Sequence, residues 1–479
     1  MGARADDPPE AGKLPTGRLA RTARVGGLVT GQGLRWAGMR TANRVRTPER
    51  AAEAESERTA ALVQQLVDQL GQMRGAAMKV GQMISMVEFD GLPEEERDDL
   101  QRRLAALRDD IPPVRFEDLE KLMRQEFGGP LGRVFRDFDK QAFAAASIGQ
   151  VHRATTVDGD EVAVKIQYPG VAEAVETDLR NVRLLLPLVK RLAPGLDAKA
   201  LASEMRERIS EELDYELEAQ NQRRIGRLMS GHPFVLVPKV HTALSTRRVL
   251  VSEYVEGEGF ESVRRADEAQ RDRYGEIVFR FHFGLLYRDR IGLGDPHPGN
   301  YLLTADGRVC FLDFGLVRYV TAGRVAAERE IALAVRDGDG EAVKAALLAG
   351  GYLPAGGADA VDAAFALGMM RMATKWFAVP GHRRFVPDGE RRRRDREPLD
   401  SEERVAARMQ VNQFTLPPEA ILIRRMHGVV AIVLRQLRAG ADWGAIAAEY
   451  LHGASPATPL GQAEADFFAR FEPAARAAP

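Results

Sequence analysis

G-D-P-H-P-G-N at residues 294–300 and F-L-D-F-G at residues 311–315 constrain the fold of this chain more than any other stretch. Together they place three polar side chains at fixed spacing: Asn300 follows Asp295 by five positions, and Asp313 follows Asn300 by thirteen. Carboxylate and amide oxygens are ligands of the kind that Mg²⁺ prefers, and protein-bound Mg²⁺ often contacts substrate phosphates as well. The triplet therefore predicts that the chain binds a magnesium nucleotide.

The spacing D-x-x-x-x-N followed by D-F-G resembles the catalytic loop and the metal-binding turn of protein kinases. In that arrangement Asp295 is the catalytic residue that orients or deprotonates the group attacking the γ-phosphate. Asn300 and Asp313 are the metal ligands. The alternative is two unrelated acidic turns, which would have to meet this spacing by chance.

Upstream motifs supply the other parts that such a site needs. Lys165 ends V-A-V-K on a predicted strand after a hairpin, where a kinase lysine contacts the α- and β-phosphates. Its acidic partner is expected on a helix predicted over residues 211–221, which leaves four candidates: Glu211, Glu212, Glu216 and Glu218. In V-L-V-S-E-Y-V-E-G (249–257), backbone groups of Glu253 and Val255 are predicted to bind the adenine edge.

The spacing of apolar residues also predicts the secondary structure around these motifs. Strands are predicted over residues 134–138, 151–157, 161–167, 235–240 and 248–255, and a long helical stretch over residues 171–229.

Two expected kinase elements are absent from the sequence. The loop between the first two strands should read G-x-G-x-x-G, but residues 144–149 read A-A-A-S-I-G. Each alanine Cβ narrows the accessible backbone angles, so a stiffer loop should change how phosphates are positioned. No A-P-E follows D-F-G, and the usual platform for a peptide substrate is missing with it.

Taken together, the motifs resemble those of the UbiB/AarF atypical kinase-like family. The shared pieces are K-V-G-Q (79–82), A-A-A-S-I-G-Q-V-H (144–152), V-A-V-K (162–165), E-L-D-Y-E-L-E (212–218), D-P-H-P-G-N (295–300) and D-F-G (313–315). They occur in the family's order over residues 74–320. The resemblance implies an α+β, bilobal protein-kinase-like fold, with a small sheet-containing N-lobe, a mainly helical C-lobe and an N-terminal helical extension.

The resemblance also implies roles for individual residues. Lys79 and Gln82 would be regulatory and project where a peptide substrate would otherwise lie, and Lys79 would meet Glu212 and Asp214 there. Glu218 would then pair with Lys165, and both would join Asp295 in the catalytic set. The implied cofactors are ATP and Mg²⁺, and the positions expected to bind the nucleotide are Ala144, Ala145, Ala146, Ser147, Gln150, Lys165, Glu253 and Val255.

The activity implied by the resemblance is Mg-dependent ATP hydrolysis rather than ordinary protein phosphorylation. The process implied is ubiquinone or other isoprenoid-quinone metabolism, or membrane lipid metabolism. Two other classes stay open. G-D-x-H-P-G-N also resembles the loop of small-molecule phosphotransferases such as aminoglycoside and choline kinases. ATP could instead only switch a helical surface of a non-catalytic binding module. The sequence does not name the phosphoryl acceptor.

Composition and charge limit the remaining function classes. The 479 residues carry 68 basic and 69 acidic side chains, a net charge of −1, which gives no overall bias toward nucleic acid. A single cysteine, Cys310, excludes an internal disulfide framework and suits a reducing cytosol. No stretch approaches 18 uncharged apolar residues and no secretory signal is present, so we expect a cytoplasmic protein, peripheral at the inner face of a membrane.

Five segments are predicted along the chain. Residues 1–50 hold ten Lys or Arg against four Asp or Glu and form a basic tail, either disordered or lying on an anionic membrane surface. A helical extension with K-x-G-Q spans 51–130, the N-lobe 131–256 and the C-lobe 257–380. A charged loop with R-R-R-R-D-R (391–396) and a helical region fill 381–479. Besides ATP, the expected partners are an anionic membrane surface and isoprenoid-lipid or quinone-pathway proteins.

Overall fold

The computed structural model describes residues 114–180 except 147 and 178, residues 210–386 except 295, 296, 355 and 357, residues 410–470 except 412 and 416, and residues 50 and 206. The chain divides into two compact units, residues 1–219 with 240–254 and residues 220–239 with 255–479. It passes from the first unit to the second within helix α8 (Tyr215–Leu228). The domain boundaries expected from the sequence stay predictions.

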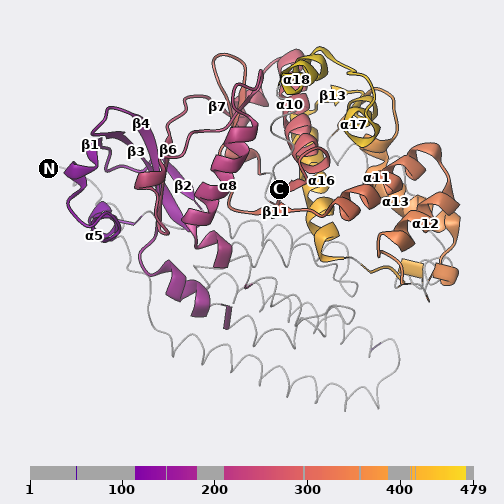
Figure 1. Ribbon diagram of the computed structural model, residues 1–479, viewed down its shortest axis with the longest axis horizontal. Coiled ribbons are helices and arrows are strands. Elements are labelled where there is room, and N and C mark those ends of the chain that lie inside the picture. Colours follow the sequence, from indigo (N-terminus) through magenta and orange to yellow (C-terminus); the bar gives the residue numbers. More distant parts are fainter. Residues whose placement is uncertain are drawn as a thin grey trace. The chain divides into compact units, whose positions relative to one another are not determined.

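The first unit is built on an antiparallel sheet, whose strands β1 to β4 are drawn in indigo and purple in Figure 1. Its main path has the order β1-β3-β4-β6, and β2 pairs with β3. The strands are β1 (Phe135–Phe138), β2 (Ala144–Ala146), β3 (Gly149–Thr156), β4 (Glu161–Gln167) and β6 (Val249–Glu253). Between β3 and β4, Gly159 has a φ of 96°, in the left-handed region that suits glycine in a tight turn.

Strand β4 has an apolar face that is buried. Val162, Val164 and Ile166 are buried against helix α5 (Phe116–Glu126), which contributes its own apolar face to the same core. Because successive side chains of a strand point to opposite faces, Lys165 projects away from this core. The alternation V-A-V-K-I thus explains both the packing of β4 and the direction of its lysine.

The alanine-rich segment expected to be a loop is part of a hairpin. Ala144, Ala145 and Ala146 form β2 and pair antiparallel with residues 149–151, so β3 begins at Gly149 rather than at Val151. The physical reason lies in Gly149, where a Cβ would stand 2.1 Å from the backbone oxygen of Ile166 on β4. The missing side chain lets β3 start earlier than the apolar pattern suggests.

The long helix expected over residues 171–229 is interrupted. Residues 210–212 are helical, but Leu213 and Asp214 leave the helix and α8 begins at Tyr215. Asp214 Oδ1 accepts hydrogen bonds from the backbone N–H groups of Glu216 (3.0 Å) and Leu217 (3.2 Å), as a helix-capping aspartate does. The single helix expected over residues 211–221 is therefore wrong, and Glu212 and Glu218 lie on different elements.

The second unit contains small sheets and most of the described helices. A sheet has the order β5-β10-β9-β7, formed by β5 (Val235–Leu236), β10 (Val309–Phe311), β9 (Tyr301–Leu303) and β7 (Glu258–Gly259). Two strand pairs are β8 (Ile291–Leu293) with β11 (Val317–Tyr319), and β12 (Arg383–Arg384) with β13 (Gly440–Ala441). The helices are α9 (Phe260–Val263), α10 (Glu268–Tyr287), α11 (Ala322–Asp337), α12 (Gly340–Ala349), α13 (Ala363–Ala378), α16 (Pro418–Leu437), α17 (Trp443–His452) and α18 (Pro459–Ala469).

Side chains at the N-termini fix where these helices start. Asp267, Thr321, Asp339, Asp442 and Thr458 each accept a hydrogen bond from a backbone N–H three residues on, at the starts of α10, α11, α12, α17 and α18. Such a side chain satisfies a donor that has no partner within the helix. Short polar residues in the sequence therefore set these boundaries.

Helix α10 is the centre of the second unit. Every residue from Ile277 to Tyr287 is buried, and the helix packs against α16 and α17. The same hydrophobic core extends to Trp443 and Ile446 of α17, so the C-terminal helices share one core with residues 257–380. The predicted α+β class, with an antiparallel sheet first and a mostly helical region after it, is confirmed.

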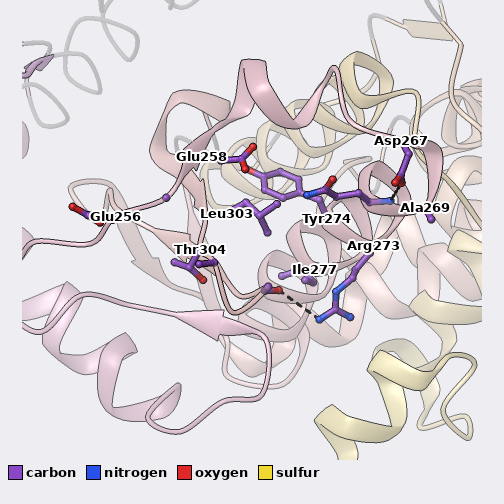
Figure 2. A pocket seen from close by; sticks show the side chains of 13 residues that line it. Glu256, Glu258, Asp267, Ala269, Arg273, Tyr274, Ile277, Leu303 and Thr304 are labelled. Atoms are coloured by element: carbon purple, nitrogen blue, oxygen red, sulfur yellow. Dashed lines mark hydrogen bonds between the residues drawn. The ribbon is translucent and has the colours of Figure 1, made fainter.

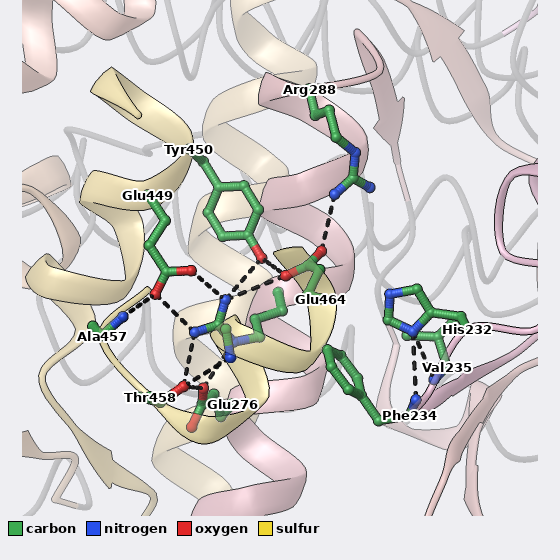
Figure 3. Close-up of polar contacts among 12 residues, drawn as sticks. His232, Phe234, Val235, Glu276, Arg288, Glu449, Tyr450, Ala457, Thr458 and Glu464 are labelled. Atoms are coloured by element: carbon green, nitrogen blue, oxygen red, sulfur yellow. Dashed lines mark hydrogen bonds and ion pairs between the residues drawn. The ribbon is translucent and has the colours of Figure 1, made fainter. Parts of the chain in front are cut away.

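A buried charge cluster joins α10 to α17 and α18 (Figure 3). The guanidinium of Arg280, 0% exposed, contacts Glu276 at 2.7 Å, Glu449 at 2.8 Å and Glu464 at 3.2 Å. Arg288 pairs with Glu464 at 2.9 Å. A buried cation with several carboxylate partners holds these helices in one register, because any shift would leave a charge unpaired.

Among the described residues, no helix combines the length and the apolar character that a membrane span requires.

Candidate functional site

In the first unit, Lys165 of β4 and Glu218 of α8 form an ion pair. The Lys165 Nζ lies 2.8 Å from Oε1 and 2.9 Å from Oε2 of Glu218. The side chain of Lys165 is 22% exposed and that of Glu218 is 5% exposed. Nζ also lies 4.9 Å from the centre of the Tyr215 ring. A lysine held on two sides presents its charge at a fixed point of the surface.

The sequence alone left four glutamates open as the partner of Lys165. The break at Asp214 separates Glu211 and Glu212 from helix α8, and Glu216 is exposed on that helix. The contact observed is the one that the family resemblance implied. The catalytic role of Lys165 and Glu218 stays a prediction.

The residues expected to bind the nucleotide lie in several settings. Ala144 and Ala145 are exposed on β2 and Ala146 is half-buried, whereas Ser147 lies outside the described residues. The Gln150 side chain is buried: its Oε1 accepts from the N–H of Val114 (3.1 Å) and its Nε2 lies 2.9 Å from His152 Nε2. A nucleotide contact through this side chain would have to replace one of these bonds, so that role stays a prediction.

The segment expected to bind adenine follows strand β6. Glu253 ends β6 opposite Val162, and the N–H of Tyr254 donates to the backbone oxygen of Glu161 at 3.0 Å. At Val255 the chain returns to the second unit. The Tyr254 ring stacks edge-on against Phe143, with ring centres 5.7 Å apart, and the Arg153 guanidinium lies 4.2 Å from its centre.

In the second unit, Asn300 and Asp313 lie side by side. Asn300 ends the short helix 298–300 before β9, and Asp313 follows β10. The side-chain nitrogen of Asn300 lies 3.3 Å from Asp313 Oδ2, and Asp313 Oδ1 accepts from the N–H of Gly315 at 2.9 Å. The N–H of Leu312 donates to the Asn300 backbone oxygen at 3.0 Å. Asp295 lies outside the described residues.

The donor chemistry of this pair fits Mg²⁺. A carboxylate and an amide this close can turn their oxygens toward one hard cation, which completes its octahedron with water and phosphate oxygens. Within the described residues, no cluster of three or more His, Cys, Asp or Glu forms a metal site of its own.

Asn221 is a residue that the sequence analysis missed. It is buried on α8, and its side-chain nitrogen donates to the backbone oxygen of Phe314, the middle residue of D-F-G, at 3.1 Å. The Tyr319 hydroxyl lies 3.5 Å from its side-chain oxygen. Asparagine is a poor former of helix interiors, so Asn221, three positions after Glu218, was the available signal.

The proposed regulatory residues separate into two groups. Lys79 and Gln82 lie outside the described residues. Asp214 caps α8, and its Oδ2 lies 4.0 Å from Arg247 Nε, while Glu212 is half-buried. Asp214 therefore has a structural task at the start of α8, whatever its relation to Lys79.

Comparison with known proteins gives a consistent result. A family model described as the ABC1 atypical kinase-like domain matches residues 106–347. The chain is 32% identical over 258 residues to AarF domain-containing protein kinase 1 of Xenopus laevis, covering 52% of this chain and 48% of that protein. It is 31% identical over 335 residues to the mitochondrial atypical kinase COQ8B of Rattus norvegicus, covering 69% of this chain and 62% of that protein. The chain thus spans about half to three fifths of the length of these relatives.

A solved structure is similar as well. The structure described as the complex of Rv3197 with erythromycin from Mycobacterium tuberculosis matches with a TM-score of 0.60 at 29% identity, covering 84% of this chain and 98% of that chain. The likeness extends over nearly all of that protein, and it agrees with the kinase-like fold that the motifs predicted.

Proposed function

Because the chain belongs to the ABC1 atypical kinase-like family, we propose that it is an atypical kinase that binds ATP and hydrolyses it with the help of Mg²⁺. The observation that carries the proposal is the pairing of Lys165 with Glu218 at 2.8 Å. Removing either partner of a buried ion pair is costly, so the pair keeps the lysine in place in the absence of nucleotide. A fixed ammonium lowers the entropy cost of aligning the α- and β-phosphates, which it would bind.

Asn300 and Asp313 would hold the metal ion. The N–H of Gly315 orients one oxygen of Asp313, and backbone contact with Leu312 holds Asn300 beside it. When bound, Mg²⁺ would neutralise charge on the β- and γ-phosphates. Asp295 would orient the attacking oxygen and accept its proton. Asn221 would hold the backbone of D-F-G through the Phe314 oxygen.

Water is the proposed main phosphoryl acceptor. The alanine hairpin replaces a flexible glycine loop, and the sequence lacks A-P-E, so the proposed site would lack the usual peptide platform and phosphate cover. The finer proposal is a role in isoprenoid-quinone or membrane lipid metabolism, on the cytoplasmic side of a membrane. It rests on the family resemblance and on the basic residues 1–50.

A small-molecule phosphotransferase is the second candidate. G-D-P-H-P-G-N resembles the loop of such enzymes, and the similar solved structure is described as a complex with erythromycin, a small molecule. In that case an acceptor hydroxyl takes the place of water at Asp295. The residues around ATP would be the same in both candidates.

Replacement of Asp313 by asparagine tests the enzymatic proposal. In a phosphate-release assay with the full chain, Asp313→Asn should lower turnover at least about a hundredfold, since even residues behind a metal ligand cost about 10–100-fold. The matched control is Asp306→Asn, an exposed carboxylate in the turn before β10. If both variants turned over ATP like the unchanged chain, Asp313 would not hold the metal.

The fate of the γ-phosphate separates the candidates. Radiolabelled ATP is followed with purified protein, with and without anionic liposomes. Label in inorganic phosphate alone supports hydrolysis, and stimulation by liposomes supports the membrane-surface partner. Label in a lipid or metabolite favours the phosphotransferase. Tight nucleotide binding with no turnover would leave only the nucleotide-gated binding module.

A further inference from the structure

The second unit contains an open pocket on the face of β9 that packs toward α10. Tyr301 and Leu303 share that face because strand side chains alternate, and the Tyr301 hydroxyl lies 3.0 Å from His282 Nε2 of α10. Leu303 and Ile277 line the pocket, whose volume is about 640 Å³. The side chain of Asn300 contacts Asp313 instead, so the pocket is distinct from the proposed metal ligands.

A buried phenol in the wall of this pocket has no hydrogen-bond partner in the part of the chain that the structure describes. Tyr274 of α10 is 1% exposed, and its hydroxyl bonds to no atom in the described part of the chain. Burial, with a smaller contribution from nearby Cys310, raises the pKa of Tyr274, so the group is a neutral phenol that can donate or accept. Figure 2 shows its ring extending from α10 toward Glu258. A buried hydroxyl without a partner is uncommon, because its lost hydration is not compensated.

The charges around the pocket disfavour an anion. Figure 2 shows Glu258 and Asp267 along one side and Arg273 on the other. Asp267 already caps α10 through the N–H of Gln270 at 2.8 Å, so the helix N-terminus does not offer a bare anion site. Arg273 is the single Lys or Arg among the 13 lining residues, and its guanidinium lies 3.5 Å from the backbone oxygen of Gly307.

We propose that this pocket binds a small organic molecule that carries a protonated amine on an apolar body. The ammonium group donates to the Tyr274 hydroxyl oxygen, and the Glu258 carboxylate balances its charge. The apolar body lies on Ile277 and Leu303. The volume falls within the range of about 300–1,000 Å³ that is typical of small-molecule sites. A purely apolar ligand would leave the Tyr274 hydroxyl unpaired. The inference does not depend on the proposed ATPase activity.

Phenethylamine is a suitable probe, because it joins an ammonium to a phenyl ring through two methylenes. Ligand-detected NMR titration of the full chain at low salt, with saturating ATP and Mg²⁺, should show saturable binding. The neutral analogue phenethyl alcohol and the anion phenylacetate should bind at least about tenfold more weakly, since charge-assisted hydrogen bonds are about twice as strong as neutral ones. Equal binding of the three probes, no saturation, or loss of amine binding when ATP is added would overturn the proposal.

Two conservative variants locate the amine. Tyr274→Phe removes only the hydroxyl, and Glu258→Gln keeps an oxygen that can accept from Ser262, which donates to Glu258 at 2.7 Å. Each should weaken phenethylamine binding about tenfold or more. Glu261→Gln is the matched control, because Glu261 of α9 lies three positions after Glu258 but pairs with Arg264 and does not line the pocket.

The unfolding temperature, measured without the probe, shows whether a loss of amine binding comes from a lost contact or from an unfolded variant. Tyr274→Phe should unfold at the same temperature as the unchanged chain or higher, because the variant no longer buries an unpaired hydroxyl. A variant that stays folded and binds the amine with unchanged affinity would show that Tyr274 does not contact it. Equal weakening by Glu261→Gln would assign the effect to general surface charge and overturn the site.

Discussion

Gly149 stands where β3 passes closest to β4. A Cβ at this position would lie 2.1 Å from the backbone oxygen of Ile166 and 3.1 Å from the Tyr215 hydroxyl, which belongs to the side chain under Lys165. The backbone of β4 cannot move away without giving up its own pairing with β6. The residue thus links the start of the alanine hairpin to the position of the lysine.

Replacement of Gly149 by alanine should destabilise the first unit by about 2 kcal/mol or more, because the clash is with backbone rather than with a flexible side chain. Denaturant unfolding of the full chain, followed by circular dichroism, measures the loss. Gly132→Ala is the matched control, since a Cβ there meets no atom of the described residues within 4 Å and should change stability by less than about 0.5 kcal/mol. Equal stability of the two variants would contradict the clash.

Two buried histidines make stability depend on pH. Burial lowers the pKa of His282 to about 3, and burial together with Arg288 lowers the pKa of His232 to about 3. Both stay neutral in the folded chain between about pH 6.5 and pH 3, whereas the unfolded chain binds protons below its ordinary pKa of 6.5. The unfolded state therefore gains protons first, and stability falls as the pH falls below about 6.5.

Each of these histidines should contribute a slope of about 1.4 kcal/mol per pH unit well below pH 6.5. Free energies of unfolding measured in denaturant at pH 7.0, 6.0 and 5.0 give the slope. His232→Asn keeps an acceptor for the N–H of Val235, 3.2 Å from His232 Nδ1, and should remove about half of the two-histidine contribution. An unchanged slope in this variant would mean that His232 is not buried neutral.

At the level of secondary-structure elements, the alanine hairpin is the part that separates this chain from ordinary kinases. Ala144, Ala145 and Ala146 are paired with residues 149–151, so their backbone is held by hydrogen bonds and by the Cβ atoms together. A strand is stiffer than the glycine loop expected at this place. The hairpin is therefore where a change in flexibility should alter phosphate positioning.

Ala145→Gly should increase autophosphorylation relative to hydrolysis. Glycine widens the accessible backbone angles and weakens the strand, so phosphate positioning becomes less restricted. We expect a change of about threefold or more, which corresponds to roughly 0.7 kcal/mol in a barrier. Labelled ATP and gel detection of phosphoprotein measure it. Ala243→Gly, on the exposed short helix 242–244 of the same unit, is the control. No difference between the two variants would count against a role for stiffness.

Arg280 of α10 holds helices α17 and α18 in place through its ion pairs with Glu449 and Glu464. Arg280→Met should destabilise the second unit by about 3–5 kcal/mol, because three carboxylates keep their burial and lose their shared cation. Arg336→Met, which breaks an exposed pair with Asp337, should cost less than about 1 kcal/mol. Urea unfolding compares the two. Adding Glu449→Gln to Arg280→Met should recover part of the loss, and no recovery would contradict a charge-based cause.

For the chain as a whole, much of the proposed site could be predicted from the sequence. The spacing within one short region identifies Asp295, Asn300 and Asp313 as candidate site residues. The two-residue alternation in V-A-V-K predicts a strand and the direction of its lysine. Helix starts follow from caps such as Asp267 and Thr321, because capping is a contact over three residues. These features depend on near neighbours, so the local sequence contains the information.

Contacts between distant residues required the folded structure. Glu218 is 53 positions from Lys165, and the residues alone left four glutamates open until the break at Asp214 and the packing of α8 selected one. Asn221 had no assigned role, because its partner is the backbone of Phe314, 93 positions away. The early start of β3 came from the approach of Ile166 to Gly149.

The motifs and their order thus fixed the family, the fold class and the chemistry to be expected, since catalytic residue types and short spacings are properties of the local chain. Tertiary packing decided the partner of Lys165, the interruption before α8, and the burial of Arg280 with Glu449 and Glu464, which are 169 and 184 positions away. It also left the Tyr274 hydroxyl without a hydrogen-bond partner among the described residues. The reason is that burial and long-range contact energies depend on which distant surfaces meet, and no local pattern encodes that.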